Sequence, residues 1–375
     1  MKKILHIIPS LKQGGAEKVL LNLVNLSNNN YFEHIIVVFN PDIKYKNILE
    51  NTKIIKFNLR LGISSFSEIR KIRKYVIKQN PDIIHAWLYK TIAFSAIILP
   101  NRFKLIGGIH HNLQNYKNEK LKTKLIIKIC RFLENNGMIN LLQYVSQSSL
   151  KSHSVFGFNN SRSIVIPNGI NTYRFKSNII KRTEYEGFDG KINESNFVIG
   201  NFGRYDPIKG HDLLFKSFAR YYSEINPKAR LVLAGYQISS TNNELVNSLR
   251  KHDISDSTVL LGEVDPIENV YPLLDVYVLT SKSESFPMVL CEAMMSKIPC
   301  ISTDVGDARI ILNDLGIIIN PKEEDLIEAL KKVNYSEKFK DKKHLQLLQQ
   351  TITNQFTSEI ANSKYEVMYK SLTNE

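Results

Sequence analysis

Cysteine is scarce in this chain of 375 residues, which holds only Cys130, Cys291 and Cys300. The three form no C-x-x-C pair and have no spacing typical of metal ligands, so neither a disulfide framework nor a metal site is indicated. Each of them lies in an apolar stretch of the sequence. This placement is typical of reduced, buried thiols in a cytoplasmic protein.

Long apolar runs are missing as well. The longest, residues 91–100, has about half the length that a membrane-spanning helix needs. The start of the chain resembles a signal peptide, but its apolar run is short and meets Gly14-Gly15 without a cleavage pattern. We therefore expect a cytoplasmic protein without a helix that crosses a bilayer.

Acidic residues are few in the first half of the chain. Residues 1–170 hold 25 Lys and Arg against 8 Asp and Glu, a net charge of +17, whereas residues 171–375 hold 25 against 28, a net charge of −3. Such asymmetry directs the basic half toward a polyanion, which is an anionic membrane, a nucleic acid or an acidic substrate. No stacking-aromatic or groove-reading motif supports a nucleic acid, and we expect none as a partner.

Two basic stretches carry much of this excess. One lies within residues 70–78, and the other is an amphipathic helix predicted over residues 115–133. The apolar repeat of that helix is Leu121, Leu125, Ile129 and Phe132 or Leu133. The lysines that we expect to face an acidic substrate or an anionic membrane are Lys117, Lys120, Lys124 and Lys128. Two solvated helix faces are the simpler interpretation.

Short β-branched runs alternate with helical stretches, which is typical of parallel sheets covered by helices on both faces. The first block of predicted strands comprises residues 2–9, 34–39, 53–57, 82–87, 105–109 and 141–145. A turn at Pro167-Asn168-Gly169 ends this block, and a polar linker over residues 176–196 leads to a second block that starts at Phe197. The predicted fold class is α/β, with two doubly wound parallel-sheet domains.

Residues 275–307 form the centre of the second block. They predict a buried strand, a polar turn, a helix from Pro287 to about Met295 and another strand. The N–H groups at the start of this helix have no intrahelical partners and make an anion site. These groups belong to Phe286, Met288 and Val289.

Two carboxylates flank this anion site, Glu284 in the turn and Glu292 in the helix. A ligand with a phosphate centre and hydroxyls on both sides, such as a sugar nucleotide, suits this pattern. The simpler interpretation is a carboxylate at a helix N-terminus and another on a solvated face. Arg204 and Lys209 follow the first strand of the second block and can converge on one anion, the first as a fork and the second as a point charge.

These motifs together resemble those of the family 4 retaining glycosyltransferases. The pair of glutamates lies in S-x-S-E-S-F-P-M-V-L-C-E-A-M, and Gly-Gly-x-Glu, Ile-Pro-Asn-Gly-Ile and Gly-Arg followed by Lys-Gly match other motifs of the family. The matches run in order from Gly14 to Tyr369, although Asn171 replaces an Asp of the family and Ile310 a Glu. The resemblance implies the GT-B fold, in which two Rossmann-like domains face each other across a cleft.

It also implies domains and residue roles. Residues 1–170 would bind the acceptor, residues 171–355 the nucleotide sugar, and residues 356–375 would form a helix that crosses back to the first domain. The catalytic residues would be His110 (or, in the alternate register, His111), Arg204, Lys209 and Glu284. Arg204 and Lys209 would bind the diphosphate, Glu284 the donor sugar and Glu292 the ribose hydroxyls. The other donor-binding residues would be Gly14, Gly15, Gly203, Ser285, Phe286, Pro287, Met288 and Val289, with Gly235 and Val264 at the ends of strands predicted over 230–235 and 259–264.

The activity implied is hexosyl transfer from a UDP-sugar to a glycan or lipid-linked acceptor with retention of configuration, as in capsule or lipopolysaccharide synthesis. The resemblance and the absence of an Asp-x-Asp at a strand end imply no metal and no cofactor, since positive side chains would replace the metal. A sugar-nucleotide epimerase of the same fold and a catalytically silent partner subunit are the alternatives. The basic first domain predicts a peripheral enzyme on the inner face of the cell membrane.

Overall fold

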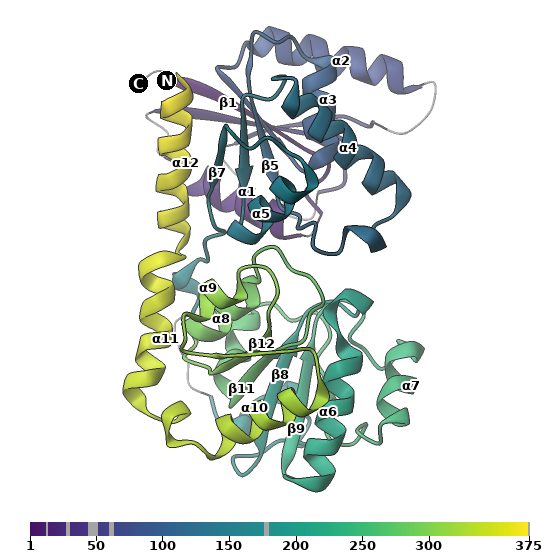
Figure 1. Ribbon diagram of the computed structural model, residues 1–375, viewed down its shortest axis with the longest axis vertical. Coiled ribbons are helices and arrows are strands. Elements are labelled where there is room, and N and C mark those ends of the chain that lie inside the picture. Colours follow the sequence, from purple (N-terminus) through teal and green to yellow (C-terminus); the bar gives the residue numbers. More distant parts are fainter. Residues whose placement is uncertain (13, 28–30, 44–51, 60–63, 176–179, 374–375) are drawn as a thin grey trace. The chain divides into compact units, whose positions relative to one another are not determined.

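A computed structural model describes residues 1–12, 14–27, 31–43, 52–59, 64–175 and 180–373 (Figure 1). Contacts divide the chain into two units, Met1–Gly169 with Ser358–Glu375, and Ile170–Thr357. Each unit is built around its own parallel sheet. None of the described helices has the length and the apolar character needed to cross a membrane.

The sheet of the first unit runs in the order β3-β2-β1-β4-β5-β6-β7. Its strands are β1 (Lys2–Ile8), β2 (Phe32–Val38), β3 (Lys53–Lys56), β4 (Ile83–Trp87), β5 (Lys104–Ile109), β6 (Leu141–Tyr144) and β7 (Ser163–Val165). Ile-rich runs form the central strands because helices bury both faces of a parallel sheet. The strand order reverses between β1 and β4, and the carboxyl ends at such a point are where open α/β sheets bind ligands.

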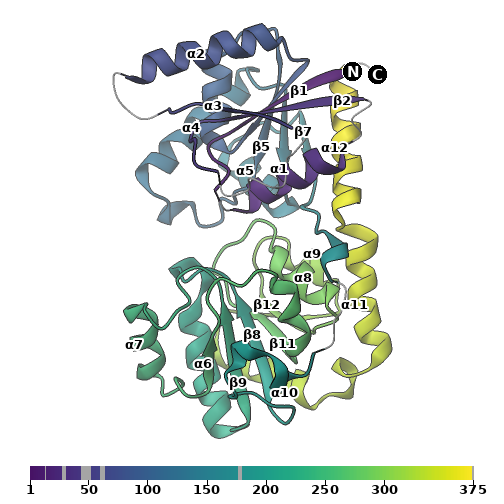
Figure 2. The ribbon, with the colours of Figure 1, turned by 180° about the vertical axis from the view of Figure 1, so that it is seen from behind.

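Helices cover both faces of this sheet. They are α1 (Gly15–Leu26), α2 (Ser64–Gln79), α3 (Tyr89–Ile98), α4 (Leu121–Asn135), α5 (Gln147–Phe156) and α12 (Ser358–Thr373). One face is packed by α2, α3 and α4 through buried residues such as Ile72, Ile92 and Ile127. On the other face α1 lies beside α12, with Leu20 and Tyr365 in one apolar cluster (Figure 2).

A row of buried histidines crosses the face that α1 and α12 cover. His6, His34 and His85 stand on β1, β2 and β4 and are buried. Trp87 Nε1 donates to His6 Nδ1 at 3.1 Å, so the proton of neutral His6 lies on Nε2, which contacts His34 Nδ1 at 2.9 Å. Burial lowers the pKa of all three rings, to about 4 for His34. The histidines therefore pack as neutral rings, and His85 Nδ1 bonds the Tyr369 hydroxyl of α12 at 2.9 Å.

The sheet of the second unit runs in the order β10-β9-β8-β11-β12-β13. Its strands are β8 (Phe197–Phe202), β9 (Ala229–Ala234), β10 (Thr258–Leu260), β11 (Val276–Leu279), β12 (Cys300–Thr303) and β13 (Ile317–Ile319). The order reverses between β8 and β11, in the same way as in the first unit. The carboxyl ends of β8 and β11 are therefore the expected ligand position in this sheet.

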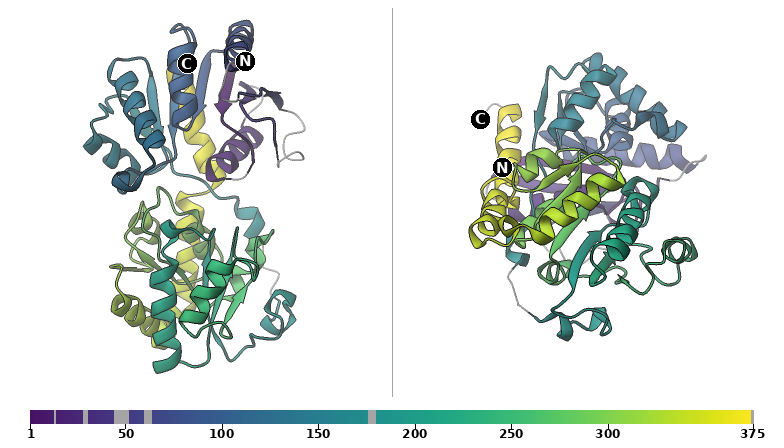
Figure 3. Two further views of the ribbon diagram at one scale, coloured as in Figure 1. Left: turned by 90° about the vertical axis from the view of Figure 1, so that its right-hand side faces the viewer. Right: turned by 60° about the horizontal axis from the view of Figure 1, so that its bottom comes forward.

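Helices again cover both faces. They are α6 (His211–Glu224), α7 (Asn243–Lys251), α8 (Met288–Met295), α9 (Ala308–Leu312), α10 (Glu323–Tyr335) and α11 (Lys342–Gln355). One face is covered by α6 and α10, which lie side by side (Figure 3), together with α7. The other face is covered by α8, α9 and α11, which contact one another. The predicted α/β class with two doubly wound parallel sheets is confirmed.

The helix predicted over residues 115–133 is wrong at its start. A 3-10 turn, η1 (Tyr116–Asn118), comes first, Lys120 is extended, and α4 begins at Leu121. Two contacts hold the chain away from the helical path before α4. Glu119 pairs with His111 at 2.9 Å, and the Tyr116 ring lies 4.5 Å from that of Phe156.

The structure also describes a further predicted strand and most of the predicted linker. The strand predicted over residues 259–264 is too long, because β10 ends at Leu260 and Gly262 takes a left-handed φ of +69°, which breaks the extended chain. Of the linker predicted over residues 176–196, residues 176–179 lie outside the described part of the structure. The remainder contains the 3-10 turns η3 (Arg182–Glu184) and η4 (Glu186–Phe188). The Phe188 side chain of η4 is buried.

Candidate functional site

The carboxyl end of β8 carries the predicted arginine. Gly203 and Arg204 follow the strand, and the 3-10 turn η5 (Pro207–Lys209) leads into α6. Asp206 braces this loop, because its Oδ1 accepts from the Ile208 N–H and its Oδ2 accepts from Arg204 Nε, both at 3.0 Å. Burial alone would raise the pKa of Asp206, but the backbone bond from Ile208 and the pairing with Arg204 together outweigh it and lower that pKa. Arg204 is thus tethered at its Nε, with its side chain 57% exposed.

Lys209 and Glu284 meet at the neighbouring ends of β8 and β11. Lys209 Nζ lies 2.7 Å from Glu284 Oε1, and Ser281 Oγ donates to the same oxygen at 2.7 Å. The two charged side chains are only 20% and 16% exposed. Residues 75 positions apart in sequence therefore form one neutral, mostly buried pair at the switch point of the sheet.

Glycines bring the loops of this site close together. Gly210 has φ +69°, and a Cβ there would collide with the carbonyl oxygen of Thr280. Gly306 has φ +57°, and a Cβ there would lie 2.5 Å from the carbonyl oxygen of Ser285. Both positions combine a left-handed backbone with a close approach, so only glycine fits without rearrangement. Neither glycine is among the site residues predicted from the sequence, although Gly210 belongs to the Lys-Gly motif.

The helix α8 begins next to Glu284. Pro287 is its N-cap rather than its first residue, and Met288 and Val289 lie in its first turn. The first N–H groups of a helix point out of its end and carry the positive end of its dipole. Phe286 anchors the turn, since it is buried and its ring centroid lies 5.5 Å from that of Phe356. These N–H groups give the second unit positive potential for an anion beside the neutral Lys209–Glu284 pair.

Glu292 lies in the second turn of α8 and is held by a residue that sequence reasoning missed. The Tyr271 hydroxyl donates to Glu292 Oε2 at 2.7 Å. Tyr271 is fully buried, and burial together with the Glu292 carboxylate raises its pKa well above the ordinary value. An aromatic residue 21 positions upstream in an apolar stretch gives no sequence signal for this contact.

The remaining predicted residues of the second unit line the ends of β8, β9 and β10. The Gly203 N–H donates to the Ala234 carbonyl at 2.8 Å, and the Gly235 N–H donates to the Gly262 carbonyl at 2.6 Å. Gly235 has φ +139°, and a Cβ there would collide with the carbonyl of Gly203. Val264 is half-buried in the loop after β10. These contacts bring Gly203 and Gly235 together. Val264 lies after β10 and is not part of the strand predicted for it.

Gly14 and Gly15 lie at the start of α1 in the first unit. Gly14 is the N-cap of α1, and Gly15 is its first residue. A Cβ on Gly15 would meet no atom within 4 Å, so the fold of the described residues does not require a glycine there.

The two candidate histidines of the first unit differ in their partners. His110 follows β5, its ring centroid lies 5.3 Å from that of Trp87, and burial lowers its pKa to about 3. His111 Nε2 lies 2.9 Å from Glu119 Oε1, and burial lowers its pKa although Glu119 opposes the shift. His110 is therefore a neutral ring near pH 7, whereas His111 is engaged with a carboxylate.

The basic helix α4 exposes part of its apolar repeat. Its buried residues are Ile127, Cys130, Leu133 and Glu134. Leu121, Leu125 and Phe132 are instead 82%, 61% and 63% exposed. Lys117, Lys120 and Lys128 are exposed in the same region, and Lys124 Nζ donates to the Lys117 carbonyl at 2.7 Å. The solvent side of α4 is therefore both cationic and apolar.

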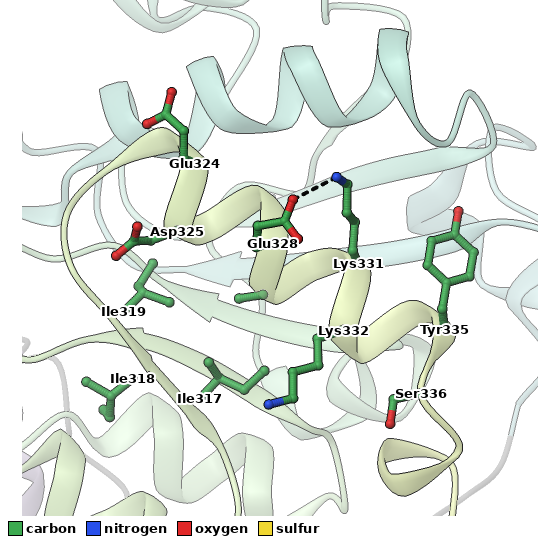
Figure 4. Close-up of a pocket in the computed structure, with 11 residues that line it drawn as sticks. Ile317, Ile318, Ile319, Glu324, Asp325, Glu328, Lys331, Lys332, Tyr335 and Ser336 are labelled. Atoms are coloured by element: carbon green, nitrogen blue, oxygen red, sulfur yellow. Dashed lines mark hydrogen bonds and ion pairs between the residues drawn. The ribbon is translucent and has the colours of Figure 1, made fainter.

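A hollow of about 800 Å³ lies elsewhere in the second unit, between β13 and α10 (Figure 4). Its lining mixes acidic and basic side chains, and Glu328 and Lys331 pair at 2.7 Å. None of the predicted donor-binding residues lines it. Its lining carries three carboxylates against two lysines, so it has no chemistry that selects an anionic donor.

Comparison with known proteins gives matches over most of the chain. The family described as Glycosyltransferase Family 4 matches residues 13–174, and the family described as Glycosyl transferases group 1 matches residues 183–347. The UDP-Gal:alpha-D-GlcNAc-diphosphoundecaprenol alpha-1,3-galactosyltransferase of Escherichia coli is 27% identical over 287 residues, which cover 72% of this chain and 71% of that protein. The O-antigen biosynthesis glycosyltransferase WclY of Escherichia coli is 21% identical over 392 residues, which cover 100% and 99%.

The fold is shared with a solved structure, that of HepE from Anabaena in complex with UDP and glucose. The TM-score is 0.83 at 20% sequence identity, and the alignment covers 99% of this chain and 100% of HepE. The GT-B fold predicted from the sequence is thereby confirmed. Since the two family matches lie one in each unit and together span most of the chain, this protein belongs to family 4 of the glycosyltransferases.

Proposed function

We propose that this glycosyltransferase moves a sugar from a UDP-sugar to a hydroxyl of a glycan or lipid-linked acceptor, with retention of configuration, in the synthesis of a cell-surface polysaccharide. The observation that carries the proposal is the Lys209–Glu284 pair at the switch point, directly before the N-terminus of α8. A site with a cation, free N–H groups and a carboxylate suits a diphosphate joined to a sugar. Two similar proteins support the donor and the acceptor, since HepE is solved with UDP and the galactosyltransferase is named for a diphosphoundecaprenol acceptor.

The chemical difficulty is the negative charge that develops on the departing diphosphate. The bond from the sugar C1 to the diphosphate oxygen breaks, a bond from C1 to the acceptor oxygen forms on the same face, and the acceptor proton passes to the departing phosphate. Arg204, Lys209 and the N–H groups of α8 would stabilise that charge, and Gly14 and Gly15 would add theirs from the first unit. Glu284 would bind hydroxyls of the sugar, and Glu292 those of the ribose.

The same charges support a reaction without a metal or other cofactor. Among the described residues, no group of three or more His, Cys, Asp and Glu side chains has an arrangement that would hold a metal ion. Arg204 and Lys209 supply positive charge where a metal would otherwise neutralise the diphosphate. His110, as a neutral ring, would contact the sugar by hydrogen bonding rather than by charge.

Donor screening tests the proposal directly. Purified protein is heated with UDP, GDP, ADP and dTDP, and a ligand that binds the native state raises the melting temperature by mass action. The matching nucleotide sugars are then assayed with and without lipid-linked acceptors, with and without EDTA. We expect stabilisation by UDP and EDTA-resistant transfer that requires an acceptor. Turnover of the donor without acceptor would identify an epimerase, and no nucleotide binding would contradict the proposal.

We also propose that the first unit attaches to the anionic inner face of the membrane through α4 and the basic helix α2. Exposed leucine and phenylalanine side chains among lysines are typical of helices that lie in a membrane interface. Each Lys or Arg near such a surface contributes about 1 kcal/mol, so a handful suffices for reversible attachment.

Sedimentation with vesicles tests this attachment. We expect binding to anionic vesicles at low salt, little binding to neutral vesicles, and weaker binding after Leu121→Ser with Leu125→Ser. Val367→Ser is the matched control, because Val367 is 64% exposed but stands on α12, which covers the opposite face of the sheet. Equal binding to both kinds of vesicle, or none to either, would leave the charge asymmetry without this role.

A further inference from the structure

Tyr271 occupies a place in the second unit that packing alone does not explain. It opens the 3-10 turn η7 (Tyr271–Leu273), which directly precedes β11. Its side chain is fully buried, and its ring centroid lies 4.9 Å from that of Phe202 and 5.7 Å from that of Tyr277. The ring is therefore fixed by aromatic contacts beneath the ends of β8 and β11, while its hydroxyl points to α8.

The hydroxyl makes one strong contact. It donates to Glu292 Oε2 at 2.7 Å, and the Val289 carbonyl lies 3.4 Å away. A hydrogen bond from a hydroxyl to a carboxylate is about twice as strong as one between two neutral groups. Because burial and the carboxylate both raise the pKa of Tyr271, the phenol keeps its proton near pH 7 and is the donor in this contact.

We propose that Tyr271 is the positioning residue for Glu292, holding one carboxylate oxygen so that the other is presented to the ribose hydroxyls of the donor nucleotide. This inference rests on the proposed function, in which Glu292 binds the ribose. A glutamate side chain has three rotatable bonds, and fixing them during binding weakens binding by the entropy that is lost. A rigid aromatic donor fixes them during folding instead, so that the carboxylate is ready when the nucleotide arrives.

The same geometry makes Tyr271 a determinant of specificity. A carboxylate held against a ribose diol distinguishes a ribonucleotide from its 2′-deoxy form, since the missing hydroxyl leaves a charged acceptor unpaired. A carboxylate free to rotate would turn to water when the hydroxyl is absent and would discriminate less. The preference for UDP over 2′-deoxy-UDP therefore reports on the brace, whereas a loss of packing would weaken both nucleotides alike.

Tyr277 provides a matched control. It is also fully buried in the same aromatic cluster, but its hydroxyl bonds the backbone of Phe202, with 3.1 Å to both the N and the O atom. Tyr277→Phe and Tyr271→Phe each remove one buried hydroxyl from neighbouring rings. Only Tyr271→Phe removes a hydrogen bond that ends on Glu292.

The experiment measures the Kd of UDP and of 2′-deoxy-UDP by calorimetry for the wild type, Tyr271→Phe, Tyr277→Phe, Glu292→Gln and the double variant Tyr271→Phe/Glu292→Gln. We expect the wild type to prefer UDP by about tenfold or more. Tyr271→Phe should weaken UDP binding by about five- to tenfold and reduce the preference, while Tyr277→Phe leaves the preference unchanged. The double variant should bind UDP no more weakly than Glu292→Gln alone, because Tyr271 acts on the nucleotide only through Glu292.

Each contrary result has its own meaning. If Tyr271→Phe weakens both nucleotides equally, through misfolding or otherwise, the hydroxyl serves only the fold and the inference is overturned. If the wild type binds UDP without preferring it over the deoxy form, Glu292 does not bind the ribose and the inference also fails, while the glycosyltransferase proposal stands. If the wild type binds no nucleoside diphosphate, the proposed function fails first and the inference with it.

Discussion

The ion pair between Lys209 and Glu284 predicts an unusual pattern in a set of variants. In the ligand-free protein each charge neutralises the other at 2.7 Å, with side chains only 20% and 16% exposed. Lys209→Met leaves a carboxylate with little access to water at the place where a diphosphate is expected. The double change Lys209→Met/Glu284→Gln also removes that unpaired charge. The single change Lys209→Met should therefore be more harmful than the double change.

The size of the effect follows from burial. Breaking a buried pair by removing one partner costs about 3–5 kcal/mol. Here Ser281 still donates to Glu284, and the side chains keep some exposure, so we expect about 2–3 kcal/mol for Lys209→Met, less than for a fully buried pair. That loss corresponds to a fall of roughly 5–10 °C in the melting temperature. Lys209→Met/Glu284→Gln should recover about half of it, and should bind UDP about tenfold more tightly than Lys209→Met does.

The assay is a double-mutant cycle on unfolding in urea and on the Kd of UDP. Lys216→Met is the control, because Lys216 stands in α6, the helix that follows Lys209, but pairs with Asp212 at 3.1 Å on the surface, with exposures of 42% and 69%. It should change stability by less than about 0.5 kcal/mol. The reasoning is refuted if the double variant is as unstable as Lys209→Met, or binds UDP as poorly.

Three further results are expected. Arg204→Ala should lower turnover by about a hundredfold, the usual effect of losing one preorganised charge contact, and near-normal turnover would remove Arg204 from the diphosphate site. Glu292→Gln should weaken the binding of bare UDP, whereas Glu284→Gln should act mainly on the nucleotide sugar; an equal loss of bare UDP binding in both variants would show that these roles are wrong. Acid should destabilise the first unit early, because burial lowers the pKa of His34 to about 4 and of His110 to about 3, so the unfolded chain binds protons first. Stability should be flat above pH 7 and should fall below about pH 6.5 by about 1.4 kcal/mol per pH unit for each such histidine, and urea titrations at pH 7.5, 6 and 5 that give equal stability would contradict this.

Local patterns in the sequence predict much of this fold because its strands and turns are set by neighbouring residues. Ile- and Val-rich runs marked the strands within a residue or two at most ends, and Pro287 marked the start of α8. Local patterns do not predict which side chains contact one another across the site. Lys209 and Glu284 were assigned separately to phosphate and sugar, and their direct pairing depends on the meeting of β8 and β11, which the sequence does not encode locally.

Where sequence reasoning failed, a contact distant in sequence decided the outcome. The helix predicted from residue 115 begins at Leu121, because the Tyr116 ring packs against the ring of Phe156 at the end of α5. The brace on Glu292 comes from Tyr271, which an apolar stretch hides. The apolar repeat of α4 was read correctly as a repeat, yet its exposure depends on which side of α4 meets α3, and Leu121 faces solvent.

The net charge of the second half of the chain does not favour an anionic donor, so individual contacts must bind it. Residues 171–375 have a net charge of −3, and the proposed donor is itself an anion, so the average field of this half opposes binding. The two glutamates nearest the proposed diphosphate would add to that opposition if they were bare. Neither is bare, since Lys209 neutralises Glu284 and the Tyr271 hydroxyl donates to Glu292. Glu284 can therefore bind hydroxyls with its charge balanced by Lys209, whereas Glu292 keeps its charge and binds through an oxygen held by Tyr271. The N–H groups at the start of α8 supply attraction for the phosphates that the net charge does not.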